Sequence, residues 1–529
     1  MTAQLPGKPR SPRLSRRTAL RLAGGAGAGA LLAAPAGHLG AQTAATPAGT
    51  PAASPTTAQA EIVIPETGAS LPTEDVTFRW VDSSEVSRGY LDAFFPKYQE
   101  AHPNITVDYQ SLPHPDLNQV IPLGIQGGSA PDVFRMPPGT PGAQAVQSGW
   151  VAPLDEVIPN FAEWKAAFPP SSFLSGINVF GGKTYSFPLL ANKYYATLML
   201  YNTGYMRDAG YDPAAKPLTW DEFRDAARKI TEAGQGQYYG LIIGGAQIDR
   251  WHVHVSGPAQ MAGAPGDVQI DWRTGEYQYT SDPYIAAIEL LLAMNADGSI
   301  FPGSISLNNP QARAMMPQGV AGMILSEGGV MPSWIREQPQ FEFNVASQPI
   351  PNDGDAMPIA ASNLGTFWWL YAESQYKEIA GDMFAYLGTA EGMTAGQIAS
   401  GGVLPLAYPE ANDAASLDPR VRQAFALYEE QMRLAPDPRV RNPDTEQVFL
   451  EMKPVQPNFG TVVQGIFAGQ LADAAAAMQD LQDRSDAELE REIKVAQDNG
   501  AQVSRDDWVF PNWDPTRDYT EEDYSALGS

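Results

Sequence analysis

The sequence predicts an α/β fold, in which parallel strands are covered by helices. Residues 76–84 (VTFRWVDSS) alternate in polarity and end in polar side chains, which is typical of a strand that leads into a loop. Residues 85–103 carry apolar side chains at helical spacing, and residues 105–112 (ITVDYQSL) follow as a second strand. A strand, a helix and a strand with short connections favour a βαβ unit, whose strands pair in parallel. Because 529 residues exceed one ordinary hydrophobic core, we also expect two or more domains.

Residues 1–40 have the composition of an export signal. Six basic residues and no acidic one lie in the first 21 positions, and an apolar, small-residue segment at 20–36 ends in the small-x-small pattern APA. The heptapeptide SRRTALR, with Arg16 and Arg17 as its basic pair, resembles the twin-arginine translocation signal. This resemblance implies export of the folded protein to the periplasm or the extracellular face of the cell envelope.

Residues 41–72 are dominated by alanine, threonine and proline. Such a segment cannot bury enough apolar surface to offset the entropy lost on ordering, so we expect a disordered linker. The chain contains no cysteine, which excludes disulfides and a lipid-modified cysteine behind the signal. No later run reaches about 18 apolar residues, so we expect no membrane insertion once the signal is cleaved.

The chain is strongly acidic. Without the six basic residues of the signal, 28 Lys and Arg stand against 60 Asp and Glu, which gives a formal charge of −32. A surface of this charge repels phosphate backbones and anionic lipids, so binding to nucleic acid or directly to a membrane is disfavoured.

Strands and helices continue to alternate along the chain, each placed by hydrophobic spacing and turn residues. We expect, in order, helix 116–128, strand 131–136, helix 141–158, strand 195–201 with a short helix behind it, helix 218–234, a hairpin at 267–281, helix 282–298, strand 320–325, a strand-like stretch at 358–374 and a helical stretch at 375–402. Nearer the carboxyl end we expect a helix at 485–500 with its own capping box, and an aromatic tail at 508–527 strapped onto the surface.

Three of these elements have specific local signals. Thr219 as N-cap and Glu222 form a capping box at the start of their helix. The hairpin turns at Thr274-Gly275, with Ile270 and Trp272 facing Tyr277 and Tyr279. Residues 320–325 are apolar without alternation and bounded by glycines, which is typical of a strand buried on both faces.

Six segments together resemble a known family. They are YQEAHPNITVDYQ (98–110), IQGGSAPDVFRM (125–136), SGWVAPLDEV (148–157), GGKTYSFPLLANKYYATLMLYNTGYMRDAG (181–210), LTWDEFRDAARKIT (218–231) and QGVAGMILSEGG (318–329). In this order, from about residue 76 to 409 with a weaker echo at 459–481, the chain resembles the extracellular solute-binding proteins (family 1) of ATP-driven importers, the group that includes maltose-binding protein. Gly322 stands where the family usually has alanine.

The resemblance implies a two-lobed periplasmic-binding-protein fold, α/β in each lobe, with discontinuous lobes and a central ligand cleft that closes by hinge motion. We assign residues 73–190 and 358–440 to the first lobe, residues 191–357 and 441–500 to the second, and residues 501–529 to an aromatic and acidic C-terminal strap. Ligands of open α/β sheets lie beyond the carboxyl ends of strands, so the site is expected where polar side chains follow strands.

Candidate ligand contacts therefore come from the ends of the predicted strands, from the first crossing between the lobes and, for Phe459, from the weakly matched segment at 459–481. Sugars present C–H faces and rims of hydroxyl groups, so aromatic rings with carboxylates, amides and arginine are the expected partners. Glu327 would accept hydrogen bonds from hydroxyl groups, and the glycines after it would let a ligand approach the backbone. The candidates are Asp82, Ser83, Arg135, Met136, Asn192, Trp251, Glu327, Gly328, Trp334, Asn363 and Phe459.

Structural roles compete with these assignments. Asp82 and Glu327 could instead cap a helix or join the lobes by a salt bridge, and Trp251 could pack in a core. Both interpretations stay open at this point.

Two other residue pairs are explained without a ligand. Trp368 and Trp369 follow one another in a strand and therefore point to opposite faces. His252 and His254 share one face of an extended segment and form a candidate metal pair, but no third ligand is near. We therefore expect neither a metal nor a cofactor.

These observations predict a monomeric, non-enzymatic receptor that captures a sugar or oligosaccharide and delivers it to the membrane permease of an importer. An exported carbohydrate-active enzyme with two carboxylates across a cleft is an alternative, although no pair of acids comes with a motif for acid and nucleophile. A polyamine or peptide ligand in the same fold is a second alternative, because the acidic balance permits a cation.

Overall fold

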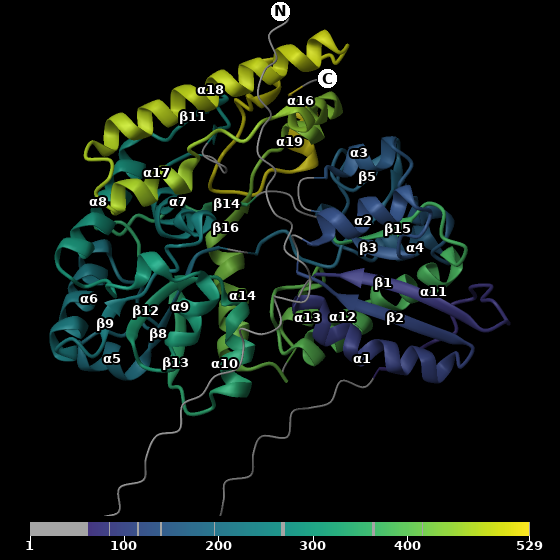
Figure 1. Cartoon of the computed structure of the whole chain (residues 1–529), viewed down its shortest axis with the longest axis horizontal. Helices are drawn as coiled ribbons and strands as arrows, with labels where there is room; N and C mark the ends of the chain where they lie inside the picture. The colour runs from purple at the N-terminus through teal and green to yellow at the C-terminus, as the bar shows by residue number, and fades with distance from the viewer. Residues whose placement is uncertain are drawn as a thin grey trace, which may run out of the picture. The chain divides into compact units, whose positions relative to one another are not determined.

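The computed structural model describes residues 62–527, apart from 84, 114–115, 138–139, 195, 266–269, 362–365 and 415. The predicted export signal, most of the predicted linker and the candidate Asn363 lie outside the described residues. Figure 1 shows two α/β lobes, each built around its own sheet. No helix within the described ranges has the length and hydropathy needed to cross a membrane.

The first sheet has the strand order β2-β1-β3-β15-β4, and β7 also pairs with β15. β1 is parallel to both β2 and β3, which confirms the βαβ prediction, whereas β15 runs antiparallel to β3. The strands of this sheet are β1 Val76–Asp82, β2 Ile105–Ser111, β3 Val133–Arg135, β4 Val151–Ala152, β7 Ser186–Phe187 and β15 Trp368–Tyr371.

Helices cover both faces of the first sheet (Figure 1). On one face α1 turns Tyr90, Leu91 and Phe94 inward, as its spacing predicts, and all three are buried. Trp368 packs with them while Trp369 packs with α2 on the other face, which confirms their opposite orientation. The elements around this sheet are α1 Glu85–Ala101, α2 Leu117–Gln126, α3 Gly142–Gln147, α4 Phe161–Ala166, α11 Lys377–Leu387, α12 Ala390–Ser400, α13 Pro409–Asn412 and the ribbon of β5 Val179–Phe180 with β6 Lys183–Thr184.

The second sheet has the strand order β13-β8-β12-β9. β12 runs antiparallel to β8 and parallel to β9, and all six of its residues are buried. The strand predicted at 320–325 is therefore buried on both faces, as expected. The strands of this sheet are β8 Leu198–Asn202, β9 Tyr239–Leu241, β12 Ala321–Ser326 and β13 Phe343–Ser347.

The local signals of the second lobe are confirmed. Thr219 accepts a hydrogen bond from the Glu222 N–H, and the Glu222 carboxylate accepts one from the Thr219 N–H. The hairpin consists of β10 Ile270–Asp271 and β11 Glu276–Tyr277, with Ile270 opposite Tyr277. The helices of this lobe are α5 Thr203–Asp208, α6 Trp220–Gly234, α7 Trp251–Met261, α8 Asp282–Ala296, α9 Asn309–Met315, α10 Met331–Glu337, α14 Pro419–Gln431, α15 Pro438–Arg441, α16 Glu446–Glu451, α17 Phe459–Phe467, α18 Ala474–Asp498 and α19 Glu521–Ala526.

Three predicted helices differ from the structure. The helix expected at 141–158 ends early, because Gly149 takes a positive φ of 67° and turns the chain into β4. The helical stretch after β15 is two helices, since the Thr389 side chain caps a new start by accepting from a backbone N–H of α12. No helix starts at Ser485, which lies inside α18 and donates its hydroxyl to the Leu481 carbonyl.

Between residues 62 and 527 the described chain crosses between the lobes three times, as its hydrophobic cores show. At each crossing, buried residues on either side belong to the cores of different lobes. The crossings lie between Tyr194 and Ala196, between Ala361 and Phe367, and between Ala411 and Leu417. Beside the crossings, β14 Ile359–Ala361 and β16 Met432–Leu434 form a parallel pair. α14 packs on β13, where the Arg420 guanidinium lies 4.1 Å from the centroid of the Phe343 ring, although we assign the range 358–440 to the first lobe. The last crossing therefore lies before residue 418 rather than at 440.

Both ends of the described chain are packed. Ile62 is 7% exposed in the first core, so residues 62–72 are not the disordered linker predicted there. The reason is composition, because isoleucine and leucine side chains interrupt the Ala/Thr/Pro-rich run at this point. The aromatic tail packs on the second lobe through the buried side chains of Trp508, Phe510, Trp513 and Tyr519.

Candidate ligand-binding site

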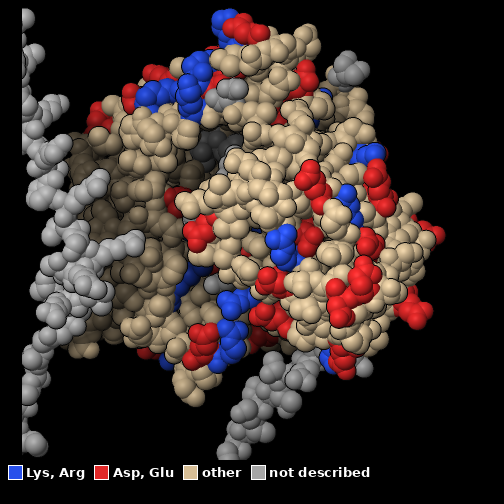
Figure 2. Space-filling view, turned by 45° about the vertical axis from the view of Figure 1, so that its right-hand side comes forward, with Lys and Arg blue, Asp and Glu red and all other residues tan. Residues whose placement is uncertain are grey.

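A hollow of about 690 Å³ lies between the two lobes next to the carboxyl end of β12. Its first-lobe wall includes Arg88 and Asp92 of α1 and the end of α12, and its second-lobe wall includes α9, Gly329 and α10. Figure 2 shows that the surface is hollowed where the lobes meet. A ligand in this interlobe hollow would contact both lobes at a strand's carboxyl end, where open α/β sheets bind their ligands.

Glu327 directly follows β12 and is held by two arginines. Arg250 Nη1 lies 2.9 Å from Glu327 Oε2, and Arg313 forms an ion pair with the other carboxylate oxygen. Arg313 also donates to the Ser326 hydroxyl at 2.7 Å. The Glu327 side chain is 9% exposed, whereas Arg250 is 27% and Arg313 17% exposed. The guanidinium groups therefore meet solvent more than the carboxylate does.

The two guanidinium groups decide the charge of Glu327. Burial alone would raise the pKa of this carboxyl, but Arg313 and Arg250 together outweigh burial and hold the pKa below its usual value. Glu327 is therefore ionised at neutral pH, and protein groups already balance its charge. The cluster therefore presents mainly N–H groups to solvent, and Glu327 positions the two arginines.

Gly328 contacts protein atoms rather than open space. Its N–H donates to the Tyr428 hydroxyl at 2.7 Å. A Cβ at this position would lie 3.0 Å from Met331 and 3.2 Å from Ala424. The glycine thus lets α14 pack closely on the turn after β12, and the approach of a ligand to this backbone stays a prediction.

Three candidate aromatic side chains lie in cores of the second lobe. Trp334 packs edge-on against Phe343, with 5.2 Å between ring centroids, although it also borders the interlobe hollow. Trp251 is fully buried, and its indole N–H donates to a loop carbonyl at 3.1 Å. Phe459 is buried and stacks on His252 at 4.5 Å. Packing accounts for all three rings, and ligand contact by any of them stays a prediction.

Asp82 and Ser83 end β1 and lead into α1. Asp82 is fully buried, and its carboxylate accepts from the Ser83 N–H at 2.6 Å, from the Trp368 indole N–H at 2.9 Å and from the Ser87 hydroxyl. These contacts describe a structural carboxylate at the start of a helix, which is the alternative to ligand binding. Ser83 is half-buried beside it.

The other candidates lie elsewhere in the fold. The Arg135 guanidinium lies 3.6 Å from the centroid of the Phe367 ring, and Met136 packs against the first sheet. Asn192 faces a different pocket, where its amide donates to the Ser171 carbonyl at 2.7 Å. Of the candidates described here, Trp334 lines the interlobe hollow. Glu327 and Gly328 lie next to it in sequence, just before the lining residue Gly329, and Glu327 pairs with the lining residue Arg313.

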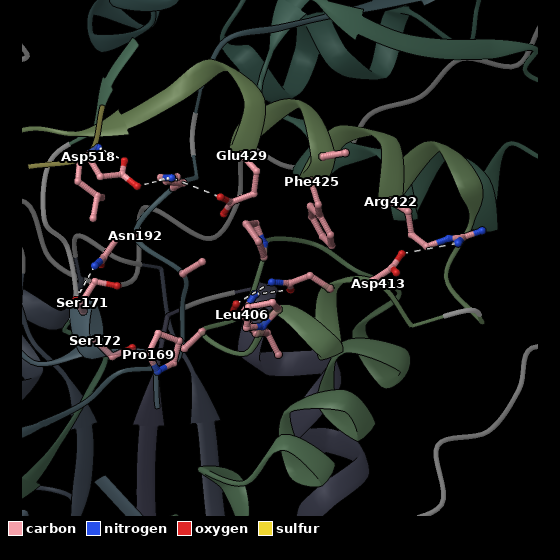
Figure 3. Close-up of a pocket in the computed structure, with 18 residues that line it drawn as sticks. Pro169, Ser171, Ser172, Asn192, Leu406, Asp413, Arg422, Phe425, Glu429 and Asp518 are labelled. Carbon is pink, nitrogen blue, oxygen red and sulfur yellow. Dashed lines mark hydrogen bonds and ion pairs between the residues drawn. The ribbon is translucent and has the colours of Figure 1, made fainter. Parts of the chain in front are cut away.

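The pocket at Asn192 has a volume of about 450 Å³ and lies beside the first crossing (Figure 3). It is bordered by Leu406 from the first lobe, by Phe425 of α14 and by Asp518 of the C-terminal strap. Two of its polar side chains are bonded to protein groups, since Asn192 binds a backbone carbonyl and Lys193 forms ion pairs. We call it the crossing pocket and do not assign the ligand to it.

His252 and His254 lie on α7 rather than on the extended segment we expect, and His254 is buried while His252 is half-buried. Burial, with the nearby charge of Arg250, lowers the pKa of His254 to about 3. Within the described ranges, no group of three or more His, Asp or Glu side chains is placed to hold a metal.

The buried His254 should make the protein less stable in acid. An unfolded histidine takes up a proton near pH 6.5, whereas folded His254 stays neutral down to about pH 3, so the unfolded state binds more protons in between. We expect this residue to lower the free energy of unfolding by about 2 kcal/mol from about pH 6.5 to 5. Urea unfolding across this range should show that the free energy of unfolding depends less steeply on pH in His254→Leu. An unchanged slope would contradict a neutral, buried His254.

Residues 82–394, more than half of the chain, match the family model of bacterial extracellular solute-binding proteins. The chain belongs to this family. Among curated relatives, a binding protein of Brucella abortus (strain 2308) is 27% identical over 261 residues, which are 49% of this chain and 59% of that protein. The sn-glycerol-3-phosphate-binding periplasmic protein UgpB of Salmonella paratyphi A is 23% identical over 321 residues, 59% of this chain and 69% of UgpB. The chain thus matches only 59% of the length of the Brucella protein.

Solved structures of solute-binding proteins share the fold. The GacH receptor of Streptomyces glaucescens, solved unliganded and with acarbose, has a TM-score of 0.58 at 18% identity and covers 78% of this chain and 98% of its own. A Thermotoga lettingae solute-binding protein bound with α-D-tagatose has a TM-score of 0.58 at 20% identity and covers 79% of this chain and 100% of its own. These similarities confirm the two-lobed periplasmic-binding-protein fold.

Sequence reasoning does not identify Arg250 or Arg313. Arg250 has a usable signal, because it lies in the segment after β9 and directly precedes the candidate Trp251. Arg313 has no such signal, because it lies on α9, 14 residues before Glu327, and only the folded chain brings the two together.

Proposed function

We propose that this protein is the solute-binding receptor of an ABC importer and that it binds a sugar or oligosaccharide in the interlobe hollow. The observation that supports this most is the Arg250–Glu327–Arg313 cluster beside a hollow lined by both lobes. Paired charges present several N–H donors to hydroxyl oxygens while much of their own charge is balanced. Membership of a solute-binding family supports binding rather than catalysis.

A cationic ligand such as a polyamine is less well supported. The Glu327 carboxylate already forms ion pairs with two guanidinium groups, and the Asp82 carboxylate is buried and accepts three hydrogen bonds. An ammonium group beside Arg250 and Arg313 would also be repelled by their charge.

The ligands named for similar proteins support a hydroxyl-rich solute. GacH was solved with acarbose, the Thermotoga protein with α-D-tagatose, and UgpB is named for sn-glycerol-3-phosphate. All three compounds carry several hydroxyl groups. A phosphate ester would also find donors in the two arginines, so the identification experiment must separate the two classes.

The proposed mechanism is a population shift between open and closed lobes. A solute that contacts both walls of the interlobe hollow binds the closed arrangement more tightly and therefore raises its population. The permease would then recognise the closed, loaded receptor. The export signal expected at residues 1–40 would deliver the receptor to the outer side of the membrane.

Native mass spectrometry of the protein purified from its own culture, with ligand identification after denaturation, tests the ligand class. We expect one saccharide per chain. If one polyamine, peptide or phosphate ester per chain is released instead, the ligand belongs to that class and not to the sugars. Turnover of an added oligosaccharide would favour the exported carbohydrate-active enzyme instead.

Arg250→Gln should weaken binding of the released saccharide about tenfold, because it removes a charged donor, an effect of about 1.4 kcal/mol. Isothermal titration calorimetry measures the change. Arg228→Gln is the matched control, since Arg228 is 45% exposed on α6 and its ion pairs within the described ranges are with Asp225 and Glu232 of the same helix. Unchanged affinity in a folded Arg250→Gln variant would remove this cluster from the site.

A further inference from the structure

The C-terminal strap, residues 501–527 in the described chain, is anchored on the second lobe. The Phe510 N–H donates to the Trp272 carbonyl at 2.6 Å, and Arg441 donates to the Asp506 carbonyl at 2.6 Å. The Trp508 and Phe510 rings are buried in the core formed by α7, α8 and α18. These contacts make the strap move with the second lobe.

Residues 516–519 of the strap lie along β16 at the crossings. The Leu434 N–H donates to Asp518 Oδ1 at 2.8 Å, and the Tyr519 N–H donates to the Leu434 carbonyl at 2.9 Å. Arg433 Nε donates to the Thr516 carbonyl at 3.1 Å. One oxygen of Asp518 is thus fixed to the backbone of the second lobe.

The other oxygen of Asp518 binds Lys193 of the first crossing. Lys193 Nζ lies 2.8 Å from Asp518 Oδ2 and 3.4 Å from Glu429 Oε2, and the lysine side chain is only 14% exposed. Figure 3 shows the carboxylates of Asp518 and Glu429 on either side of one amine, to which dashed lines join them both. Because the lysine is largely buried, water weakens this ion pair less than it weakens one on an open surface.

The backbone around Lys193 is bonded to the first lobe. The preceding Asn192 donates to the Ser171 carbonyl at 2.7 Å, and the Ala191 N–H donates to the Pro405 carbonyl at 3.0 Å. The packing changes to the second lobe only at Ala196. Lys193 therefore lies on the first-lobe side of the pivot, and Asp518 lies on the second-lobe side.

We propose that the strap restrains rotation of the lobes, with the Lys193–Asp518 ion pair stabilising the interlobe arrangement described here. The two ends of the pair move with different lobes, so rotation about the first crossing changes their separation. The strap thereby sets the balance between lobe arrangements before any solute binds. This role goes beyond the proposed function and does not depend on which solute is captured.

The test measures the distance between the lobes in the ligand-free, full chain. The sequence has no cysteine, so Thr106→Cys on β2 and Gln237→Cys behind α6 give two specific sites for spin labels. Pulsed electron–electron double resonance then measures the distance distribution between the two labels, which reports the populations of the lobe arrangements. We expect Asp518→Asn and Lys193→Gln each to change the population ratio about twofold to fivefold. The charge-swapped pair Lys193→Glu with Asp518→Lys should restore much of the original distribution.

Asp523→Asn is the matched control within the strap. Asp523 pairs with Arg517 at 2.6 Å and has no contact with the first lobe among those the structure describes, so its loss should leave the interlobe distances unchanged. Unchanged distances in both Asp518→Asn and Lys193→Gln would overturn the proposal. An equal change in Asp523→Asn would also overturn it, because loosening of the strap would then explain the effect.

Discussion

Replacing Trp251 by alanine is expected to lower the free energy of unfolding by about 3–5 kcal/mol. The ring is fully buried at the start of α7, lies 5.1 Å from the Phe467 ring and donates its indole N–H to the Gly245 carbonyl. Alanine would leave a cavity among fixed elements and would remove one of the two side-chain hydrogen bonds to the Gly245 carbonyl, which also accepts from the Gln464 amide. Urea unfolding followed by far-UV circular dichroism measures the change.

Two variants separate packing from other causes of this loss. Trp251→Phe keeps most of the volume but loses the N–H, so it should cost about 1–2 kcal/mol. Leu123→Ala removes an apolar side chain that is 65% exposed on α2 and should change stability by less than about 0.5 kcal/mol. If Trp251→Ala unfolds like the original protein but binds solute weakly, Trp251 contacts the ligand and does not act through packing.

Glu327→Ala is expected to cost about 2–3 kcal/mol, because it leaves Arg250 and Arg313 largely buried without their shared carboxylate. This figure is below the loss for a fully buried pair, since both arginines keep some contact with water. Glu327→Gln keeps one acceptor oxygen and should lose about half as much. The same unfolding measurement, made at neutral pH, gives both values.

The cost of Glu327→Ala should also depend on pH in a defined direction. The folded pKa of Glu327 lies below the ordinary value of 4.5, so its contribution is complete above that pH and is lost as pH falls through the folded pKa. The difference between variant and original protein should therefore shrink in acid. Glu337→Ala is the control, because both side chains of the Arg336–Glu337 pair are exposed. This pair should contribute less than about 1 kcal/mol to the free energy of unfolding. A cost that grows below about pH 4 would contradict the ion-paired state of Glu327.

Local signals predicted the elements that depend on neighbours in sequence. The capping box of Thr219 and Glu222 and the buried run at 320–325 fold as expected, because each signal lies within one helix or strand. The apparent capping box at Ser485 fails, since packing of α18 on α16 and α17 stabilises a continuous helix through that position.

The candidate site was less accessible to sequence reasoning. The rule that polar residues follow strands selected Glu327 at the end of β12, but it says nothing about which cations reach that carboxylate. Arg250 and Arg313 arrive from a loop and from α9, and their meeting depends on how the second lobe packs. Burial of Trp251 and Phe459 is likewise a property of the assembled core, because a ring after a strand can face either a ligand or a helix.

The three crossings also set the order in which the protein can be completed during synthesis. All strands of both main sheets lie before residue 372, yet the core around α7 and α8 also needs Phe459, Trp508 and Phe510. A chain growing from its amino end can thus finish its first lobe while the apolar sides of α7 and α8 still lack these partners. Premature termination near residue 415 would spare one lobe and leave the other without much of its core, so the second lobe becomes stable only when nearly the whole chain has been made.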